Sequence, residues 1–276
     1  MAQRGRPLSC QAIPQAKRYE HITRSRALTS RFENKGRGRS EQSRELHDSV
    51  SLKSVLKKIF AGLVPSELAV FPEIEFDLNE CRPLLKGRVL NAGAGWRDVS
   101  HLVDGELVNQ DLSYPGDDRA NVHISSPLHK IPAESNYFDA ILCIAVLEHV
   151  ENPEEVVPEL YRVLKPGGHL IVEVPFLQPE HKVPTDYQRY TRDGLARLVT
   201  HHGFFVENVK GLFTVYHTLY WQVHIWLHLK NGPLYLFLRL VLLRPLLWSA
   251  RHSKTYSDRL ASGFQLIATK KVASTN

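Results

Sequence analysis

The sequence contains little cysteine. Of its 276 residues only three are cysteines, Cys10, Cys81 and Cys143, and they lie far apart in the chain. An odd number at wide spacing excludes a disulfide framework and favours a reducing compartment. Cys143 lies inside an apolar run, so we expect it to pack in a core rather than to react. The N-terminal region has no apolar stretch typical of a secretory signal, which favours a cytoplasmic location.

Excess positive charge is absent outside the first 50 residues. Residues 1–50 hold eleven Lys/Arg against five Asp/Glu, a difference of six that equals the net charge of the whole chain. The remainder is neutral, which argues against a nucleic-acid-binding domain. Residues 1–45 have few large apolar side chains and no clear period, so we predict a basic, disordered tail. Contact of this tail with anionic lipid or nucleic acid is the alternative. A transit peptide fits its Arg/Ser content but not Glu20 and Glu33.

Short apolar runs alternate with helix-like segments over most of the remaining chain. Apolar residues at helical spacing predict a helix within 46–63, in an N-terminal extension covering 46–85. This alternation predicts an α/β fold: a doubly wound, mostly parallel sheet with helices on both faces. The expected strands are 87–93, 106–111, 138–146, 168–176, 204–210 and 263–270, and the clearest helices are 153–168 and 191–204, the second capped by Thr191.

One segment, residues 212–250, does not follow this alternation. It predicts two apolar helices joined at Asn231-Gly232-Pro233. The second, ending at Trp248, would span roughly 24 Å, less than the hydrocarbon thickness of about 30 Å, and it carries Arg239 and Arg244. We therefore expect no regular transmembrane span. The alternatives are insertion into a membrane surface, a homodimer or lid interface, and ordinary core. The first is favoured by the arginines and by three aromatic residues, Trp221, Trp226 and Trp248.

The stretch VLNAGAGWRD (89–98) predicts a nucleoside site. Gly93 and Gly95 follow the first expected strand, and open parallel sheets bind ligands at that edge. Asp111, sixteen residues after Gly95, ends the next strand, where a carboxylate can accept hydrogen bonds from ribose hydroxyls. The third glycine of a dinucleotide fingerprint is replaced by Asp98, which would repel a pyrophosphate. We therefore expect a nucleoside ligand without phosphates.

Three motifs carry a resemblance to a known family. AGAG, DLS and the long run FDAILCIAVLEHVENPEEVVPELYRVLKPGGHLIVEVPF resemble class I S-adenosylmethionine-dependent methyltransferases, in particular the group containing ubiquinone and menaquinone biosynthesis methyltransferases. The resemblance covers residues 86–210 and the final strand. It implies a seven-stranded Rossmann-like sheet with a reversed last strand, a methyltransferase core at 86–211, a helical hairpin insertion at 212–250, and the final strand within 251–276.

The resemblance also implies S-adenosyl-L-methionine as the cofactor and assigns its contacts. The two glycines would face the methionine part, Asp111 the ribose, residues 124–126 the adenine, and residues 145–149 the methyl group. The expected cofactor contacts are Asn91, Gly93, Gly95, Asp111, Leu112, Ser125, Ser126 and Ala145. Asn91 stands where related sequences commonly have an acid, and Ser125 and Ser126 stand in place of an aspartate. Both residue types still offer hydrogen-bond acceptors, so we interpret them as weakened contacts.

Candidate groups for the chemistry gather in residues 180–194, after the fifth strand. A hydroxyl acceptor is helped by a general base, whereas a carboxylate acceptor needs none. We predict His181 as the base with His149 as the second candidate, and a catalytic role for Asp186 and for Arg189, the latter as an anion clamp. Tyr187 and Tyr190 are the expected substrate contacts. In the structural alternative Asp186 pairs with Arg189 and the tyrosines pack the loop. Similar runs occur in methyltransferases associated with cell-surface glycan or lipid pathways.

These patterns predict an enzyme that methylates an oxygen of a small-molecule, glycan or lipid-linked acceptor, located in the cytoplasm and peripheral at the inner membrane face. A cofactor-binding, membrane-associated module with weak catalysis is one alternative, and an NAD-dependent oxidoreductase is a less favoured one. Nucleic acid is not an expected partner. No metal site is predicted, because His217, His224 and His228 share a helical face with Trp221 but lack the close ligand spacing of a zinc site.

Overall fold

The computed structural model describes residues 64–71, 75–112, 121–182 and 185–272. Contacts divide the chain into two units, residues 1–50 and 51–276, and every described residue belongs to the second. Two sequence predictions lie outside the described residues, the disordered tail at 1–45 and the helix within 46–63.

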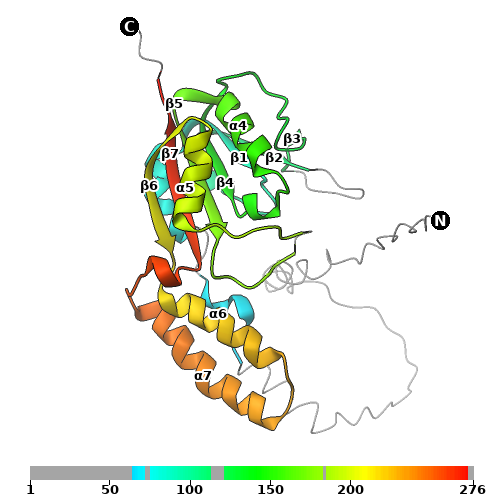
Figure 1. Cartoon of the computed structure of the whole chain (residues 1–276), viewed down its shortest axis with the longest axis vertical. Helices are drawn as coiled ribbons and strands as arrows, with labels where there is room; N and C mark the ends of the chain where they lie inside the picture. Colours follow the sequence, from blue (N-terminus) through cyan, green and yellow to red (C-terminus); the bar gives the residue numbers. More distant parts are fainter. Residues whose placement is uncertain (1–63, 72–74, 113–120, 183–184, 273–276) are drawn as a thin grey trace, which may run out of the picture. The chain divides into compact units, whose positions relative to one another are not determined.

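A seven-stranded sheet with the order β3-β2-β1-β4-β5-β7-β6 forms the framework (Figure 1). Strands β1 to β5 pair in parallel, and β7 runs antiparallel to both of its neighbours. The predicted fold class and the reversed last strand are therefore confirmed. The strands are β1 (Lys86–Ala92), β2 (Asp104–Asp111), β3 (Ile124–Ser125), β4 (Phe138–Ile144), β5 (Leu164–Pro175), β6 (Phe204–Leu212) and β7 (Gly263–Lys270).

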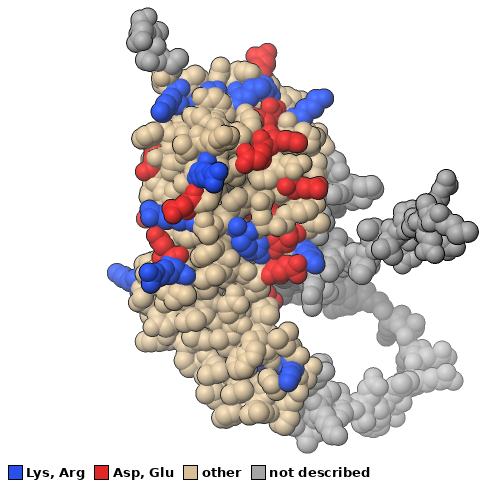
Figure 2. Space-filling model, in the orientation of Figure 1, with Lys and Arg blue, Asp and Glu red and all other residues tan. Residues whose placement is uncertain are grey.

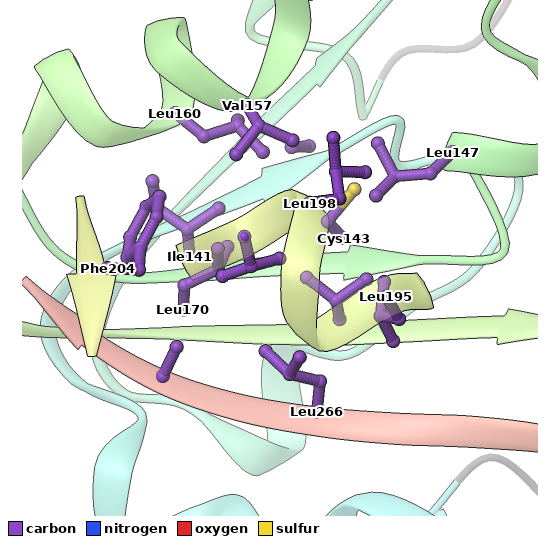
Figure 3. Packing of buried hydrophobic residues seen from close by; sticks show 14 of the residues in the cluster. Ile141, Cys143, Leu147, Val157, Leu160, Leu170, Leu195, Leu198, Phe204 and Leu266 are labelled. Atoms are coloured by element: carbon purple, nitrogen blue, oxygen red, sulfur yellow. The ribbon is translucent and has the colours of Figure 1, made fainter. Parts of the chain in front are cut away.

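Two long helices cover one face of the sheet, α4 (Pro153–Val163) and α5 (Arg192–His201). Their apolar side chains pack against the strands, and Leu160 and Leu195 lie in one cluster with Leu170 of β5 (Figure 3). Cys143 lies in the same core, and burial raises the pKa of its thiol to about 12, which agrees with a packing role. The predicted cap of α5 is confirmed, because the Thr191 hydroxyl accepts a hydrogen bond from the Gly194 N–H at 3.1 Å.

Helix α4 ends five residues before the predicted boundary at 168. Leu164 is already extended and pairs with Phe138 of β4, so β5 starts there. The physical reason is Pro166, which disfavours a helical conformation at Lys165. The two-residue strand β3 was too short to be predicted from an apolar run.

The opposite face of the sheet is covered by shorter elements in the described part of the chain. These are α3 (Glu75–Leu78) and the 3-10 turns η2 (Asn79–Leu84) and η3 (Ser100–Leu102). Leu78, Cys81 and Leu102 pack against Val89 of β1 and Leu142 of β4. The prediction of helices on both faces is thus met by long helices on one side and short turns on the other.

The predicted hairpin lies between β6 and β7. It consists of α6 (Val215–His228) and α7 (Pro233–His252), joined through Gly232 at φ +144°. The two helices pack on each other and on η1 (Glu67–Val70) around a separate small core. Arg239 of α7 donates hydrogen bonds to the carbonyls of Leu227 and Lys230, which ties the end of α6 to α7.

Helix α7 extends four residues beyond the predicted end at Trp248. Its 20 residues span about 30 Å at 1.5 Å per residue, which matches the hydrocarbon thickness. By length and composition it is the kind of helix that can cross a membrane, and 11% of its apolar window is buried. The predicted length of this helix was therefore wrong, and length no longer argues against a transmembrane span. Arg239 and Arg244 within the helix still argue against one.

Candidate active site

The loop after β1 needs glycine at two positions for different reasons. Gly93 and Gly95 have φ of +70° and +57°, a region that favours glycine. A Cβ added to Gly93 would lie 2.5 Å from Val146 Cγ2, so this residue permits the close approach of the loop after β4. A Cβ at Gly95 would have no neighbour within 4 Å. The space above Gly95 is therefore open to a ligand.

Asp111, at the end of β2, holds this loop in place. Its Oδ2 accepts a hydrogen bond from the Gly95 N–H at 2.7 Å, and its Oδ1 accepts one from the Leu112 N–H at 2.7 Å. A carboxylate has about four lone-pair positions, so both oxygens keep capacity for further donors such as ribose hydroxyls. The structure thus brings Asp111 and Gly95 together, and their assignments to the ribose and to the methionine part stay predictions.

Gln110 is a residue of this site that the sequence analysis did not single out. Its side-chain oxygen accepts from the Gly93 N–H at 3.1 Å, and its side-chain amide donates to the carbonyl of Ser126 at 2.5 Å. It therefore links the ends of β1, β2 and β3. The available signal was an amide next to Asp111 at the end of an apolar run.

Ser125 and Ser126, whose contact with the adenine stays a prediction, lie at the end of β3 beside the end of β2. Ser125 ends β3 and is exposed. The Ser126 hydroxyl is buried and has no hydrogen-bond partner among the described residues. Buried polar atoms are normally paired, so this hydroxyl fits a ligand that supplies the missing donor or acceptor. The buried Ser126 hydroxyl and the open space at Gly95 suit an adenosine-containing cofactor, whose contacts with these residues stay a prediction.

Asn91 and Asp98 make local contacts. Asn91 is buried, and its amide donates to the Asn109 side-chain oxygen at 3.0 Å across β1 and β2. Its assignment to the methionine end of the cofactor stays a prediction. Asp98 is exposed and accepts from the Ser100 N–H at 2.9 Å, which starts η3. The acid in place of a third glycine thus has a structural role, and its hydrogen bonds with Ser100 lower its pKa.

Arg97 adds a cation that was not singled out from the sequence. Burial lowers the pKa of its guanidinium, and it interacts electrostatically with Glu173, Glu148 and Asp111. The carboxyl edge of the sheet therefore holds one cation among three carboxylates.

The backbone is strained immediately after β4. Ala145 has φ +52°, which is uncommon for a residue with a side chain. Its N–H donates to the Glu173 carbonyl at 2.8 Å, which holds the conformation in place. Such outliers cluster at functional sites. Here the outlier turns the chain into η4 (Leu147–His149), at the position expected to border the methyl group.

The turn η4 and the loop after β5 bring three titratable side chains together. His181 Nε2 lies 3.5 Å from Glu148 Oε1, and His149 Nε2 lies 3.7 Å from the same oxygen. The two imidazole rings meet edge to face with centroids 5.1 Å apart. Glu148 is fully buried and raises the pKa of His181. Both histidines were proposed from the sequence, but Glu148 was missed, although the LEH motif contains it.

The loop carrying His181 is held by an ion pair. Arg189 binds both oxygens of Asp186, which lowers the pKa of this carboxyl to about 2, and Asp186 also accepts the His181 N–H at 2.8 Å. The pairing alternative for these two residues is therefore what the structure shows, and a role of Arg189 as anion clamp stays a prediction. Tyr190 is buried and its hydroxyl donates to the Leu147 carbonyl at 3.2 Å, whereas Tyr187 is exposed.

The histidines of α6 serve the hairpin. His217 accepts the Thr214 N–H at 3.2 Å and closes a capping box at the start of α6. His224 and His228 stack with centroids 4.1 Å apart. Trp221 is buried, and its indole N–H donates a hydrogen bond to Glu67 at 2.8 Å. The expectation that Trp221 faces a membrane surface is therefore wrong. Trp226 and Trp248 are exposed.

Comparison with known proteins places this geometry in a family. Residues 91–172, from β1 through most of β5, match the family model of a methyltransferase domain. The chain is 26% identical over 133 residues to a ubiquinone/menaquinone biosynthesis C-methyltransferase of Vibrio cholerae, covering 41% of this chain and 51% of that protein. It is 30% identical over 142 residues to the same enzyme of Yersinia enterocolitica, covering 44% and 57%. The alignments thus span about half of these relatives.

Solved structures show a limited likeness. A putative methyltransferase from Bacillus halodurans has a TM-score of 0.47 at 16% identity, covering 73% of this chain and all of that one. A phosphoethanolamine N-methyltransferase from Haemonchus contortus, in complex with S-adenosyl-L-methionine, has a TM-score of 0.48 at 14% identity, covering 81% and 59%.

The family match contains the glycine loop, Asp111 and the LEH motif, and it favours the methyltransferase prediction over a dinucleotide-dependent oxidoreductase. The cofactor expected from the sequence, S-adenosyl-L-methionine, is the cofactor of this family. Residues 91–172 thus match a methyltransferase domain, which supports the resemblance to class I S-adenosylmethionine-dependent methyltransferases.

Proposed function

We propose that this protein transfers a methyl group to an oxygen atom of a lipid-linked acceptor at a membrane surface. The observation that carries the oxygen assignment is the cluster of Glu148, His149 and His181 at the carboxyl edge of the sheet. This cluster adjoins the cofactor loop, because Val146, two residues before Glu148, contacts Gly93. Imidazoles at that place suit a hydroxyl acceptor, which loses a proton during transfer.

The bound cofactor supplies a methyl group that its sulfonium already activates, so the protein must mainly orient the acceptor and exclude water. His149 donates from Nδ1 to the Thr185 carbonyl, which leaves Nε2 free to accept a proton. His181 is partly exposed, so an acceptor can reach it, and Glu148 stabilises its protonated form. These two imidazoles are the groups that would take the acceptor proton.

The helical hairpin supports a lipid-linked acceptor over a freely soluble one. The stripe Leu234, Phe237, Val241 and Trp248 recurs at i, i+3, i+7 and i+14 on α7. These four side chains are between 47% and 64% exposed, and their spacing places them on one face of α7. Charged side chains are nearly absent over the hairpin on the face shown in Figure 2.

The charge of the same region matches an anionic lipid surface. Residues 208–257 contain no Asp or Glu and hold six Lys/Arg. Basic residues close to a membrane attract anionic lipids, and exposed tryptophans such as Trp226 and Trp248 prefer the interface. We therefore favour a hairpin lying in the membrane surface, where a lipid-linked acceptor would be presented to the cofactor site.

The function is tested with the full chain and methyl-labelled S-adenosylmethionine. The enzyme is incubated separately with a total lipid extract and with the water-soluble metabolites of the source cell. We expect label in the lipid fraction, and chemical analysis of that product should show a methyl ether rather than an N-methyl or C-methyl group. Label only among water-soluble products would contradict the lipid acceptor, and label on nitrogen or carbon would contradict the oxygen assignment.

A further inference from the structure

Glu148 has a buried carboxylate that the protein leaves without hydrogen bonds. Its side chain is fully buried, and neither oxygen has a hydrogen-bond partner among the described residues. Burying such a group without compensation is costly, and buried carboxylates are normally paired or bound to a metal. The carboxylate is therefore the feature of this site that most requires a partner.

Two imidazole nitrogens face this carboxylate at distances close to those around a metal ion. His181 Nε2 and His149 Nε2 lie 3.5 Å and 3.7 Å from Glu148 Oε1, and the three ligand atoms all lie within 4.8 Å of one another. Nitrogen and oxygen ligands bonded to one ion at about 2.0–2.2 Å are roughly 3–4 Å apart. A small contraction would bring all three into one coordination sphere.

The Nδ1 atoms of both rings lie near hydrogen-bond acceptors. If each Nδ1 carries the proton, the lone pair of each Nε2 faces Glu148. His149 Nδ1 lies against the Thr185 carbonyl. His181 Nδ1 lies 3.4 Å from the Pro179 carbonyl and 3.8 Å from Asp186 Oδ2. Metal-binding histidines usually donate their other N–H to a carbonyl or carboxylate in this way, which leaves the inner nitrogen free to bind.

Arg189 lies beside the same ring without blocking it. Its Nη2 is 3.4 Å from His181 Nδ1, but this amino group donates to the Pro179 carbonyl and to Asp186. Both N–H groups of Nη2 therefore donate to these acceptors and not to His181. The N–H at His181 Nδ1 can also point to the Pro179 carbonyl or to Asp186. The ion pair of Arg189 with Asp186 therefore fixes the ring orientation.

We propose that Glu148, His149 and His181 bind one first-row divalent metal ion, such as Zn²⁺ or Mn²⁺. No metal site is predicted from the sequence, but two nitrogens and one carboxylate suit these ions better than Mg²⁺ or Ca²⁺, which prefer oxygen ligands throughout. Three protein ligands leave at least one position open. The role of the ion rests on the proposed function: it would bind the acceptor oxygen and lower its pKa, with His181 as a ligand instead of a base.

Arg97 is the competing cation for Glu148. It interacts electrostatically with this carboxylate, and also with Glu173 and Asp111. If a metal ion binds Glu148, the carboxylates of Glu173 and Asp111 still compensate the positive charge of Arg97. The rival arrangement is a metal-free site in which Arg97 and protonated His181 neutralise Glu148, and the experiment is designed to separate the two.

The test is equilibrium dialysis of the full chain, purified without a histidine tag and stripped with EDTA, against Zn²⁺ and then Mn²⁺, followed by elemental analysis. We expect one equivalent of metal and at least a tenfold loss of affinity in Glu148→Gln and in His181→Ala. His202→Gln is the matched control, because His202 forms a similar pair with Glu154, at 2.6 Å, on the surface. It should bind as the wild type does. Absence of stoichiometric binding, or equal affinity in Glu148→Gln, would overturn the site.

A second measurement guards against misfolded variants. The metal should raise the melting temperature of the wild type and of His202→Gln but not of Glu148→Gln, whose circular dichroism without metal should match the wild type. The metal site and its role in methyl transfer can be disproved independently of each other. If zinc binds at Glu148 but no acceptor is methylated, the proposed function is contradicted while the metal site stands. Full methyl transfer by the EDTA-stripped protein would overturn the role of the ion.

Discussion

The carboxylate of Asp111 accepts the backbone N–H of Gly95 at 2.7 Å, so the acid expected to bind the ribose also anchors the glycine loop. The two functions share one side chain because β1 and β2 are parallel neighbours whose carboxyl ends meet at one edge. We therefore predict that a change at Asp111 removes a contact with the cofactor, and it also removes the hydrogen bond that anchors the glycine loop.

Asp111→Ala should weaken binding of S-adenosylhomocysteine by about 1–3 kcal/mol, because hydrogen bonds to a charged acceptor are lost. Isothermal titration calorimetry measures this effect. Asp98→Ala is the control, since Asp98 is exposed and its carboxylate accepts a hydrogen bond from the Ser100 N–H in the neighbouring turn. An affinity unchanged by Asp111→Ala would dismiss the ribose assignment.

The two glycines should respond differently to alanine. Gly93→Ala places a Cβ 2.5 Å from Val146 in a left-handed conformation, so we expect a loss of at least about 2 kcal/mol in the free energy of unfolding. Gly95→Ala meets no neighbour, so backbone strain of about 1 kcal/mol is the main cost.

The same Gly95→Ala change puts a methyl group into the space assigned to the cofactor, so affinity for S-adenosylhomocysteine should fall more than stability does. Urea unfolding and calorimetry on both variants check these expectations. Equal affinity in Gly95→Ala and the wild type would show that the cofactor does not lie over this residue.

The hairpin should lose stability in mild acid through His217. Burial lowers the pKa of this histidine from its ordinary value of 6.5 to about 4, so folding favours its neutral form. The contribution is therefore fully present above pH 6.5 and is lost as the pH falls from 6.5 to about 4, by at most about 3 kcal/mol.

His217→Gln separates this titration from those of other groups. Glutamine at the third helical position can keep the capping contact with Thr214 but has no proton to bind. The difference in unfolding free energy between wild type and variant, measured by urea unfolding near neutral pH and again in mild acid, should shrink or reverse on acidification. A difference that is constant with pH would show that His217 is not buried as a neutral group.

Membrane binding should depend on the exposed face of α7. In flotation with vesicles of phosphatidylglycerol and phosphatidylcholine, the full chain should rise with the lipid. A triple variant, Phe237→Gln, Val241→Gln and Trp248→Gln, should stay behind because it loses the exposed apolar stripe. Phe205→Gln is the control, since Phe205 is comparably exposed but lies on β6. Equal flotation of all three proteins would remove the hairpin from the proposal.

Periodicity and spacing in the sequence were enough for the fold class and for six of the seven strands, but not for the two-residue β3 or for the direction of β7. The alternation of apolar runs and helical segments depends on local patterns of 2 and 3.6 residues, which a single chain displays directly. The resemblance added the reversed β7, and the bounds of that strand were correct. The end of α7 was missed, since Ser249 to His252 continue a helix that apolar spacing alone did not extend.

The chemistry of the site depended on contacts that no local pattern reveals. His149 and His181 could be proposed from their positions after the fourth and fifth strands, but their shared partner Glu148 could not, because its burial and lack of hydrogen bonds exist only once β4 and β5 lie side by side. Likewise, Trp221 is apolar and aromatic in the sequence, and only packing against Glu67 decides that it faces inward. Sequence alone determined the sheet, the glycine loop and the cofactor, since these follow from local spacing and from the motifs that carry the resemblance. Tertiary structure decided which charges meet, because residues as far apart in the chain as Glu148 and His181 become neighbours only through the pairing of strands.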